Sequence, residues 1–130
     1  HVRFFNDPDT GKDLSVNYYK RAIHKMENRI PNAHYYIFSD RPEDASRLIH
    51  IPSDRVTIVN HNYGDINAYA DLWLMTLCNH FIIANSTFSW WGAWLSESVG
   101  KYIIAPEYKN EINNSSKSFN SIIPSGWNKC

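Results

Sequence analysis

The sequence predicts an α/β fold, a Rossmann-like parallel sheet with helices on both faces. Strand-like and helix-like segments alternate about five times along the chain. The strand-like segments, such as Phe81–Ala84, are continuous apolar runs, which is typical of parallel strands covered on both faces. With 130 residues, 43% of them hydrophobic, the chain is long enough for one domain with its own core and too short for two.

The first half of the chain predicts three strands and two helices. His1–Phe5 is rich in β-branched and aromatic residues and ends at a turn-forming stretch, which predicts a short strand. Ser15 is suited to a helix N-cap, and apolar side chains then recur at helical spacing from Val16 to Asn28. The other elements expected here are a strand at His34–Phe38, a helix from Pro42 to about Ile49 and a strand at Val56–Val59.

The second half predicts two helices and two strands. A mostly buried helix is expected from Ile66 to Cys78, with Asp71 as its single acid. Phe81–Ala84 is the next strand, followed by a helix to about Ser98 with Gly100 as a C-cap candidate. The remaining elements are a strand at Tyr102–Ala105 and a loop at Asn110–Ser121, closed by Ile122–Pro124 and Trp127.

The net charge and the cysteine and histidine content indicate which partners and cofactors to expect. The formal net charge of zero provides no field for gathering nucleic acid, so we expect no nucleic-acid partner and at most peripheral membrane association. Cys78 and Cys130 are too few for a disulfide framework and are expected to be buried free thiols in a reducing, cytoplasmic compartment. The histidines lack metal-ligand spacing, so we expect neither a metal nor a cofactor. The abrupt start within a strand-like segment suggests a fragment.

The strongest candidate site is the polar turn Asn85–Ser89, between a predicted strand and a helix. Ligands of parallel α/β sheets bind at the carboxyl ends of strands, and those ends carry this turn together with Arg3, Asp40 and His61. Ser86, Thr87 and Ser89 are suited to a helix N-terminus, where free N–H groups and the helix dipole attract anions. The alternative is that one of these hydroxyls only caps a helix packed by its tryptophans.

Arg3 and Asp71 each have two interpretations, one as a ligand-binding residue and one as a structural residue. Arg3 shares a strand face with His1, and its guanidinium is suited either to a phosphate or to a salt bridge with a carboxylate. Asp71 lies in an apolar helical segment, where a buried carboxylate needs a partner. That partner is a ligand's N–H groups or Arg3, unless Asp71 faces solvent.

The run from Leu77 to Leu95, LCNHFIIANSTFSWWGAWL, closely resembles the hallmark motif of family 11 glycosyltransferases, the α-1,2-fucosyltransferases. Tyr18–Ile23 with Ile37–Asp40 resembles the second motif of that family, and His1–Arg3 resembles the start of its first motif, His-x-Arg-Arg-Gly-Asp. The C-terminal end of the family is matched by Ile103–Pro106, Ile123, Pro124 and Trp127.

This resemblance implies a two-domain GT-B enzyme in which residues 1–130 are the GDP-fucose-binding half and the N-terminal acceptor domain is absent. It implies an inverting transfer of fucose to a sugar hydroxyl without a required metal, in bacterial surface polysaccharide synthesis, and the isolated half is expected to be inactive. Arg3 would be catalytic through the β-phosphate, Asp71 would accept from guanine, and the 85–89 turn would hold the pyrophosphate. The donor-binding residues implied are His1, Arg3, Asp40, Asp71, Asn85, Ser86, Thr87, Phe88 and Ser89.

Departures from the family pattern keep other functions open. Phe4-Phe5-Asn6 replaces the Arg-Gly-Asp of the first motif, which leaves the general base unassigned, and Arg41 replaces the second acid after Asp40. A degenerate GDP-sugar-binding module without transfer activity is one alternative. A carbohydrate-binding domain that stacks sugars on its tyrosines and tryptophans is another, although most aromatic residues are expected on core faces.

Overall fold

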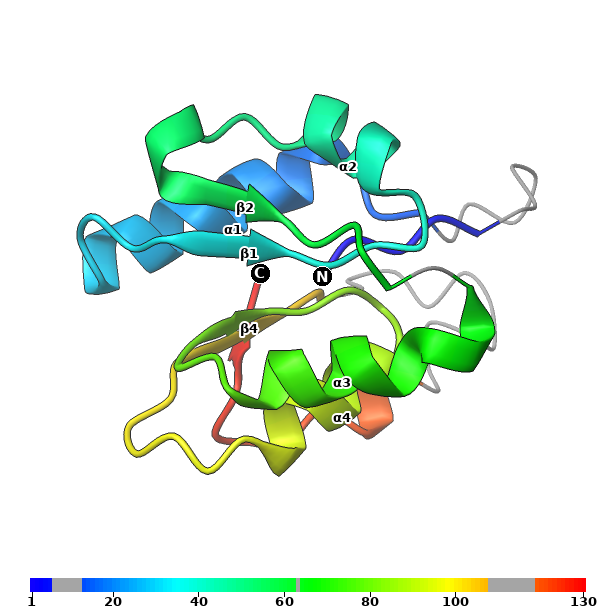
Figure 1. The fold of residues 1–130 in the computed structure, drawn as a ribbon. Coiled ribbons are helices and arrows are strands. Elements are labelled where there is room, and N and C mark those ends of the chain that lie inside the picture. Colours follow the sequence, from blue (N-terminus) through cyan, green and yellow to red (C-terminus); the bar gives the residue numbers. More distant parts are fainter. Residues whose placement is uncertain (6–12, 63, 108–118) are drawn as a thin grey trace.

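The computed structural model describes residues 1–5, 13–62, 64–107 and 119–130 as a mixed α/β fold (Figure 1). Its helices are α1 (Val16–Arg29), α2 (Pro42–Leu48), η2 (Ser53–Arg55), η3 (Asp65–Asn67), α3 (Ala68–Thr76) and α4 (Thr87–Leu95). Its strands are β1 (Tyr35–Ile37), β2 (Val56–Ile58), β3 (Phe81–Ile82), β4 (Ile103–Ala105) and β5 (Asn128–Lys129).

The strands form two small parallel sheets that the first residues of the chain join. One sheet pairs β1 with β2, and the other has the order β3-β4-β5. Val2 forms a parallel bridge with Ser39, just beyond β1, and its backbone N–H donates to Phe38 O at 2.9 Å. On the other side, the α-amine of His1 donates to Ile82 O at 2.8 Å. Residues 1–3 therefore lie between β1 and β3.

The resulting spatial order is β2, β1, residues 1–3, β3, β4, β5. Numbered along the chain, these strand segments run 3-2-1-4-5-6, which is the order of a doubly wound dinucleotide-binding sheet. The structure is thus consistent with the predicted Rossmann-like fold. In such a sheet the ligand crevice lies where the order reverses, here between residues 1–3 and β3.

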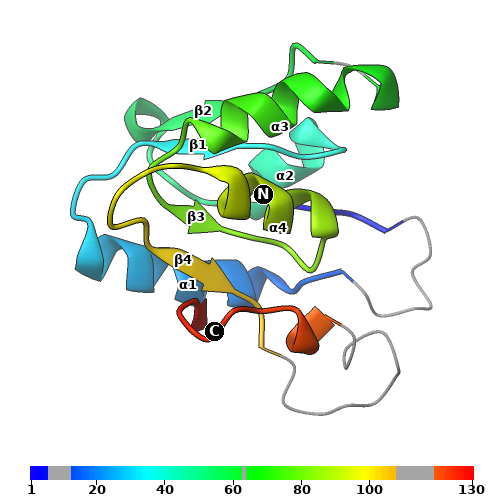
Figure 2. The ribbon, with the colours of Figure 1, turned by 90° about the horizontal axis from the view of Figure 1, so that it is seen from below.

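Helices cover both faces of this arrangement, as predicted (Figure 2). On one face α1 is held by Tyr18, whose hydroxyl donates to Ile83 O at 2.6 Å, and by the core it shares with Val2 and Ile37. On the other face Phe38 and Val59 pack against Met75 of α3. Ala93 of α4 belongs to a third cluster, which includes Phe81, Ile83, Ile103, Ala105, Phe119 and Ile123.

The predicted strand at His1–Phe5 is much shorter in the structure. Among these residues only Val2 forms a β-bridge. The backbone N–H groups of Phe4 and Phe5 instead donate hydrogen bonds to two carboxylates. Phe4 N donates to Asp40 Oδ1 at 3.0 Å, and Phe5 N donates to Asp13 Oδ1 at 2.7 Å. The chain therefore leaves the sheet after Val2.

The helix predicted to reach Ser98 ends at Leu95, because a lysine side chain donates hydrogen bonds to the carbonyl groups at its C-terminal end. Lys101 Nζ donates to Ala93 O at 2.7 Å, Trp94 O at 3.0 Å and Ser96 O at 2.7 Å. A lysine ammonium at this end also interacts favourably with the helix dipole. Gly100, the predicted C-cap, instead lies beyond the helix end with φ +72°.

Other predictions also need correction. α3 begins at Ala68 rather than Ile66, after the 3-10 turn η3. Residues 119–121 are helical, and β5 is a strand that the sequence did not indicate; residues 110–118 lie outside the described residues. Both cysteines are free, but half-buried rather than buried. Three tryptophans expected in the core are about half exposed or more, namely Trp73 (61%), Trp91 (49%) and Trp94 (50%).

No helix of the described residues has the length and apolar character needed to span a membrane.

We expect Lys101→Met to destabilise the protein by about 2 kcal/mol, because its charge-assisted hydrogen bonds to the end of α4 are lost while the apolar stem is kept. Chemical denaturation measures this loss. Lys20→Met, at an exposed position on α1, is the control and should leave the unfolding free energy nearly unchanged. Equal stabilities of the two variants would show that Lys101 does not hold the helix end.

α3 and α4 approach each other closely at a glycine. A Cβ atom on Gly92 would lie 2.9 Å from Met75 Cε and 3.1 Å from Met75 Cβ. These distances are shorter than ordinary van der Waals contact, so a larger residue at position 92 requires the Met75 side chain to move or the two helices to separate. The glycine therefore sets the spacing of the helix that carries Asp71 and the helix that follows the 85–89 turn.

Gly92→Val is accordingly expected to cost about 1–3 kcal/mol of stability through overpacking. Gly126→Val is the matched control, because no atom lies within 4 Å of a Cβ placed there. The comparison of unfolding midpoints in denaturant tests the expectation, and an equally small loss in both variants would contradict it.

Candidate functional site

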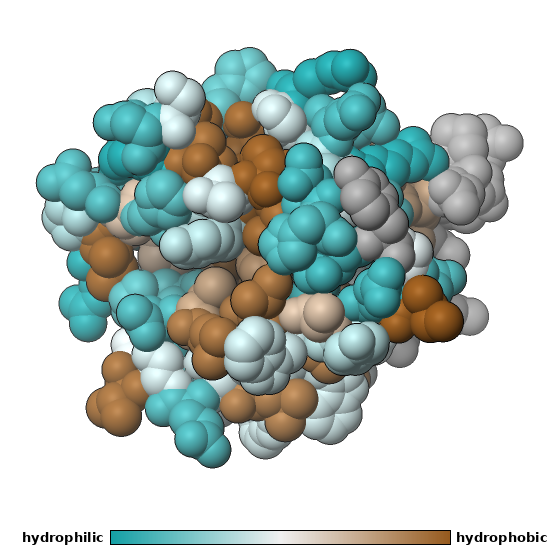
Figure 3. Space-filling view, in the orientation of Figure 1, coloured by the Kyte–Doolittle hydropathy of each residue, from teal (hydrophilic) through white to brown (hydrophobic). Residues whose placement is uncertain are grey.

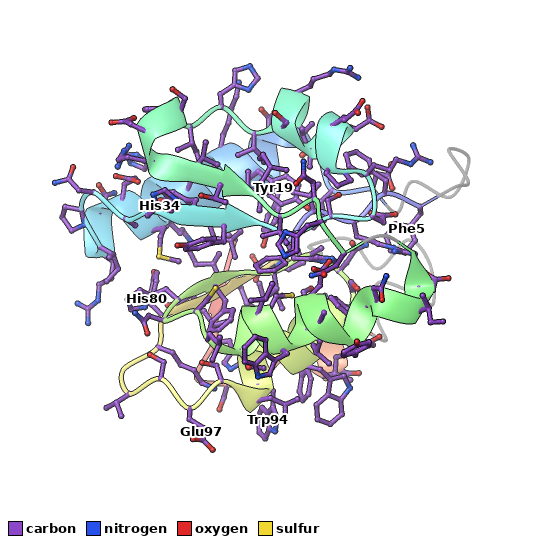
Figure 4. All side chains as sticks on the ribbon, in the orientation of Figure 1. Phe5, Tyr19, His34, His80, Trp94 and Glu97 are labelled. Atoms are coloured by element: carbon purple, nitrogen blue, oxygen red, sulfur yellow. The ribbon has the colours of Figure 1, made fainter. Side chains whose placement is uncertain are left out.

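The candidate site lies at the carboxyl edge of the strands, where the predicted residues come from separate loops. Arg3 and Asp40 follow the first strand segment and β1, Asn62 follows β2, and the 85–89 turn follows β3. Because the strands are parallel, these loops gather at one edge of the sheet. Figure 4 labels Phe5 at this edge and His34 and His80 at the opposite one.

Arg3 and Asp40 are brought together by the structure. Arg3 NH1 lies 3.4 Å from Asp40 Oδ2, with 43% of the arginine side chain and 25% of the aspartate side chain exposed. The other carboxylate oxygen accepts from Phe4 N, and the guanidinium lies 5.8 Å from the Phe5 ring centroid. The salt bridge anticipated for Arg3 is thus present, and its partner is a predicted site residue.

His1 and Phe88 form a second contact between predicted residues. Their rings lie 5.6 Å apart, which connects the first strand segment with the first turn of α4. The Nδ1 atom of His1 is buried, and within the described part of the chain it has no hydrogen-bond partner. A buried nitrogen of this kind costs free energy unless it is paired, so it marks a position where a ligand's polar group would be stabilised.

The 85–89 turn presents the start of α4 with its N-terminal amides free of side-chain capping. Ser86 occupies the N-cap position, but its side chain makes no capping hydrogen bond. Ser86 is therefore the N-cap residue, but the alternative in which its hydroxyl only caps the helix is not supported, and within the described residues the first N–H groups of α4 have no side-chain cap from it. Thr87 is exposed and Asn85 is half-buried.

Ser89 has a different role from its neighbours. Its side chain is fully buried, and its hydroxyl donates to Ser86 O at 3.1 Å and to Ala84 O at 3.4 Å. These bonds fix the strand-to-helix turn from inside. The hydroxyl of Ser89 thus supports the turn and does not face the site.

Asp71 is half-buried on α3 and has a partner that the sequence analysis missed. Asn62 Nδ2 donates to Asp71 Oδ1 at 2.7 Å. Asn62 lies in the polar loop after β2. Its position at the end of a predicted strand is the sequence feature that could have indicated it as a site residue. His61, in the same loop, is exposed.

No group of three histidine, cysteine, aspartate or glutamate side chains that could hold a metal ion occurs among the described residues. One cavity of about 750 Å³ among the described residues is lined by His1 and His61 but by none of Arg3, Asp40 and the 85–89 turn. Arg3, Asp40 and the 85–89 turn therefore lie outside this cavity.

Comparisons with known proteins identify the family. The sequence profile of Glycosyl transferase family 11 matches residues 11–130. An O-antigen biosynthesis glycosyltransferase, WbnK, of Escherichia coli is 35% identical over 123 residues, which cover 90% of this chain and 40% of the relative. An α-1,2-colitosyltransferase of Escherichia coli is 37% identical over 92 residues, covering 68% of this chain and 30% of the relative.

The chain thus spans well under half the length of these two relatives. No solved structure matches it significantly. The profile match covers nearly the whole chain and includes the run from Leu77 to Leu95. This protein belongs to glycosyltransferase family 11.

Proposed function

We propose that this chain is the donor-binding, C-terminal half of a GT-B glycosyltransferase that moves fucose from GDP-fucose to a sugar hydroxyl in α-1,2 linkage. The observation that carries the proposal is the position of Arg3. It follows the strand segment next to β3, at the point where the strand order reverses, and the 85–89 turn follows β3 itself. Sheets of this order bind nucleotides at that point.

The pyrophosphate of the donor would bind between Arg3 and the start of α4. The salt bridge to Asp40 uses only NH1 of Arg3, so other N–H groups of the guanidinium are available for a β-phosphate. The amides of Thr87 and Phe88, which have no side-chain cap from Ser86 within the described residues, and the positive end of the helix dipole would supply the second half of an anion site. His1 Nδ1 would supply a further polar contact.

The nucleobase would be read by Asp71. Asn62 occupies only Oδ1 of this carboxylate, which leaves Oδ2 to accept from the N–H groups of guanine. The same hydrogen bond orients the carboxylate at the carboxyl edge of the sheet. Asp40 would contact the ribose or hold Arg3.

The reaction would be an inverting displacement. The acceptor hydroxyl attacks the anomeric carbon of fucose, the bond to the β-phosphate oxygen breaks, and GDP leaves with the electron pair. Charge grows on the departing phosphate through an oxocarbenium-like transition state, and Arg3 and the amides of α4 stabilise it. The acceptor would be held by a domain outside these 130 residues.

The two relatives support transfer in surface polysaccharide synthesis, since one takes part in O-antigen biosynthesis and the other is an α-1,2-colitosyltransferase. The second name makes colitose a competing donor sugar. Because the roles proposed for Arg3, Asp71 and the 85–89 turn concern the nucleotide, they are the same for either sugar. A cytoplasmic location with at most peripheral membrane contact is part of the same proposal.

Binding of GDP tests the site directly. At about one hundred times its dissociation constant, GDP should raise the unfolding free energy of the chain by about 2.7 kcal/mol, whereas free fucose should not. Asp71→Asn should abolish the preference for GDP over inosine diphosphate, which lacks the 2-amino group. Thermal denaturation of both chains with each nucleotide measures this, and stabilisation by fucose alone would favour the carbohydrate-binding alternative.

Transfer itself tests Arg3. In the full-length enzyme Arg3→Ala should lower kcat by roughly 100-fold to 1,000-fold, because a donor to the developing charge is lost. Arg21→Ala, at an exposed position on α1, is the control and should retain wild-type turnover. Turnover of Arg3→Ala within a few-fold of the control would exclude the proposed role, and bound GDP without any transfer would favour the degenerate module.

A further inference from the structure

The inverting displacement proposed above needs a group that takes the proton of the acceptor hydroxyl. Such a general base must reach that proton and must have an acceptor atom that is not already engaged. At the carboxyl edge of the sheet, both oxygens of Asp40 are engaged, one by Phe4 N and the other by Arg3. One oxygen of Asp71 accepts from Asn62, and the proposed contact with guanine uses the other. Neither carboxylate is therefore suited to be the base.

Asp13 brings a further carboxylate to this edge. Its Oδ1 atom accepts from Phe5 N at 2.7 Å, so the carboxylate lies beside the chain two residues after Arg3. The side chain is exposed, and among the described residues its Oδ2 atom has no partner. Figure 4 labels Phe5 at this edge, and Figure 3 shows mostly hydrophilic residues on the side of that face where the strands end. An accessible oxygen in polar surroundings is suited to a sugar hydroxyl.

The position of Asp13 is fixed from two sides. Leu14, the next residue, packs against the core cluster that contains Tyr18. Ser15 then caps α1, where its side chain accepts from Tyr18 N at 3.3 Å. The hydrogen bond from Phe5 N holds the carboxylate itself. A carboxylate held in this way is already oriented when a substrate binds, which favours proton transfer.

The spacing between Arg3 and Asp13 suits an inverting reaction. The base of such a reaction lies across the anomeric carbon from the leaving group, and in inverting glycosidases the two catalytic carboxyl groups are about 6.5–9.5 Å apart. Two residues of extended chain, here from Arg3 to Phe5, span roughly 7 Å at most. A phosphate held by Arg3 and a carboxylate held at Phe5 N can therefore face one anomeric carbon from two sides.

We propose that Asp13 is the catalytic base of the transfer, an inference that rests on the proposed function and extends it. The acceptor oxygen forms its bond to the anomeric carbon while its proton passes to Asp13 Oδ2. The bond from that carbon to the β-phosphate oxygen breaks, and GDP leaves with the electron pair. Asn6 stands where the His-x-Arg-Arg-Gly-Asp pattern has its aspartate, so Asp13 supplies a carboxylate to the residue just before that position.

Two substitutions in the full-length enzyme separate catalysis from support of the chain. Asp13→Asn keeps an oxygen that can accept from Phe5 N but takes up no proton, whereas Asp13→Ala removes both functions. We expect kcat to fall in both variants by roughly 100-fold to 10,000-fold, the usual contribution of a general base. GDP should stabilise both variants as much as the unsubstituted enzyme, because Asp13 is not among the proposed donor contacts. Asp54→Asn, at an exposed position on η2, is the matched control and should retain turnover.

Chemical rescue gives a second measurement. Formate is a small carboxylate that fits the space left by Asp13→Ala, so it should restore part of the lost turnover of this variant. It should not restore Arg3→Ala, whose defect concerns the leaving group. No restoration in Asp13→Ala, or equal restoration in both variants, would overturn the assignment.

The outcomes for Asp13→Asn distinguish this inference from the proposed function. Turnover close to that of the control, with a loss in Asp13→Ala alone, would show that the carboxylate only holds Phe5 N and would overturn the proposal. Weaker GDP binding in Asp13→Asn would overturn it too, in favour of a role in holding the donor. If the unsubstituted enzyme neither binds GDP nor transfers a sugar from it, the proposed function is contradicted and this inference with it.

Discussion

Two backbone hydrogen bonds, from Val2 N to Phe38 O and from His1 N to Ile82 O, are the constraint on which the structure depends. They join sheets that otherwise share no strand, and they place residues 1–3 where the strand order reverses. The position of Arg3 follows from them, since it is the next residue after Val2.

The helix after the 85–89 turn is fixed at both ends by different means. At its start the buried hydroxyl of Ser89 bonds to backbone carbonyls, and within the described residues the Ser86 side chain does not cap the N-terminal amides. At its end Lys101 Nζ binds three carbonyl oxygens. The positive charge of Lys101 interacts favourably with the negative end of the helix dipole, and the positive end lies at the N-terminus, as the proposed anion site requires. Gly92 then allows α3 to approach closely.

The alternation of apolar runs and helical spacing was enough to predict a mixed α/β fold with parallel strands, because parallel strands and their covering helices have distinct periodicities. It could not predict β5, whose Asn128 and Lys129 carry no strand signal and pair only because β4 lies beside them. Helix spacing likewise failed for Trp91 and Trp94, which stay half exposed against Trp90. Of the site, strand ends indicated Arg3 and Asp40, whereas the pairing of Asn62 with Asp71 depends on tertiary geometry.

Asp40 has two effects on Arg3: it positions the guanidinium, and it competes with the proposed phosphate for it. As a partly exposed ion pair, the contact with Arg3 is worth at most about 1 kcal/mol, whereas a charge-assisted bond in a site closed over by a ligand is worth about 1.5–3 kcal/mol. A phosphate bound as proposed would therefore replace Asp40 as the partner of the guanidinium without displacing the backbone. Asp40 keeps its bond from Phe4 N, which holds the chain after Arg3 in place. With no net charge on the protein to attract an anion from a distance, the affinity must come from such local exchanges.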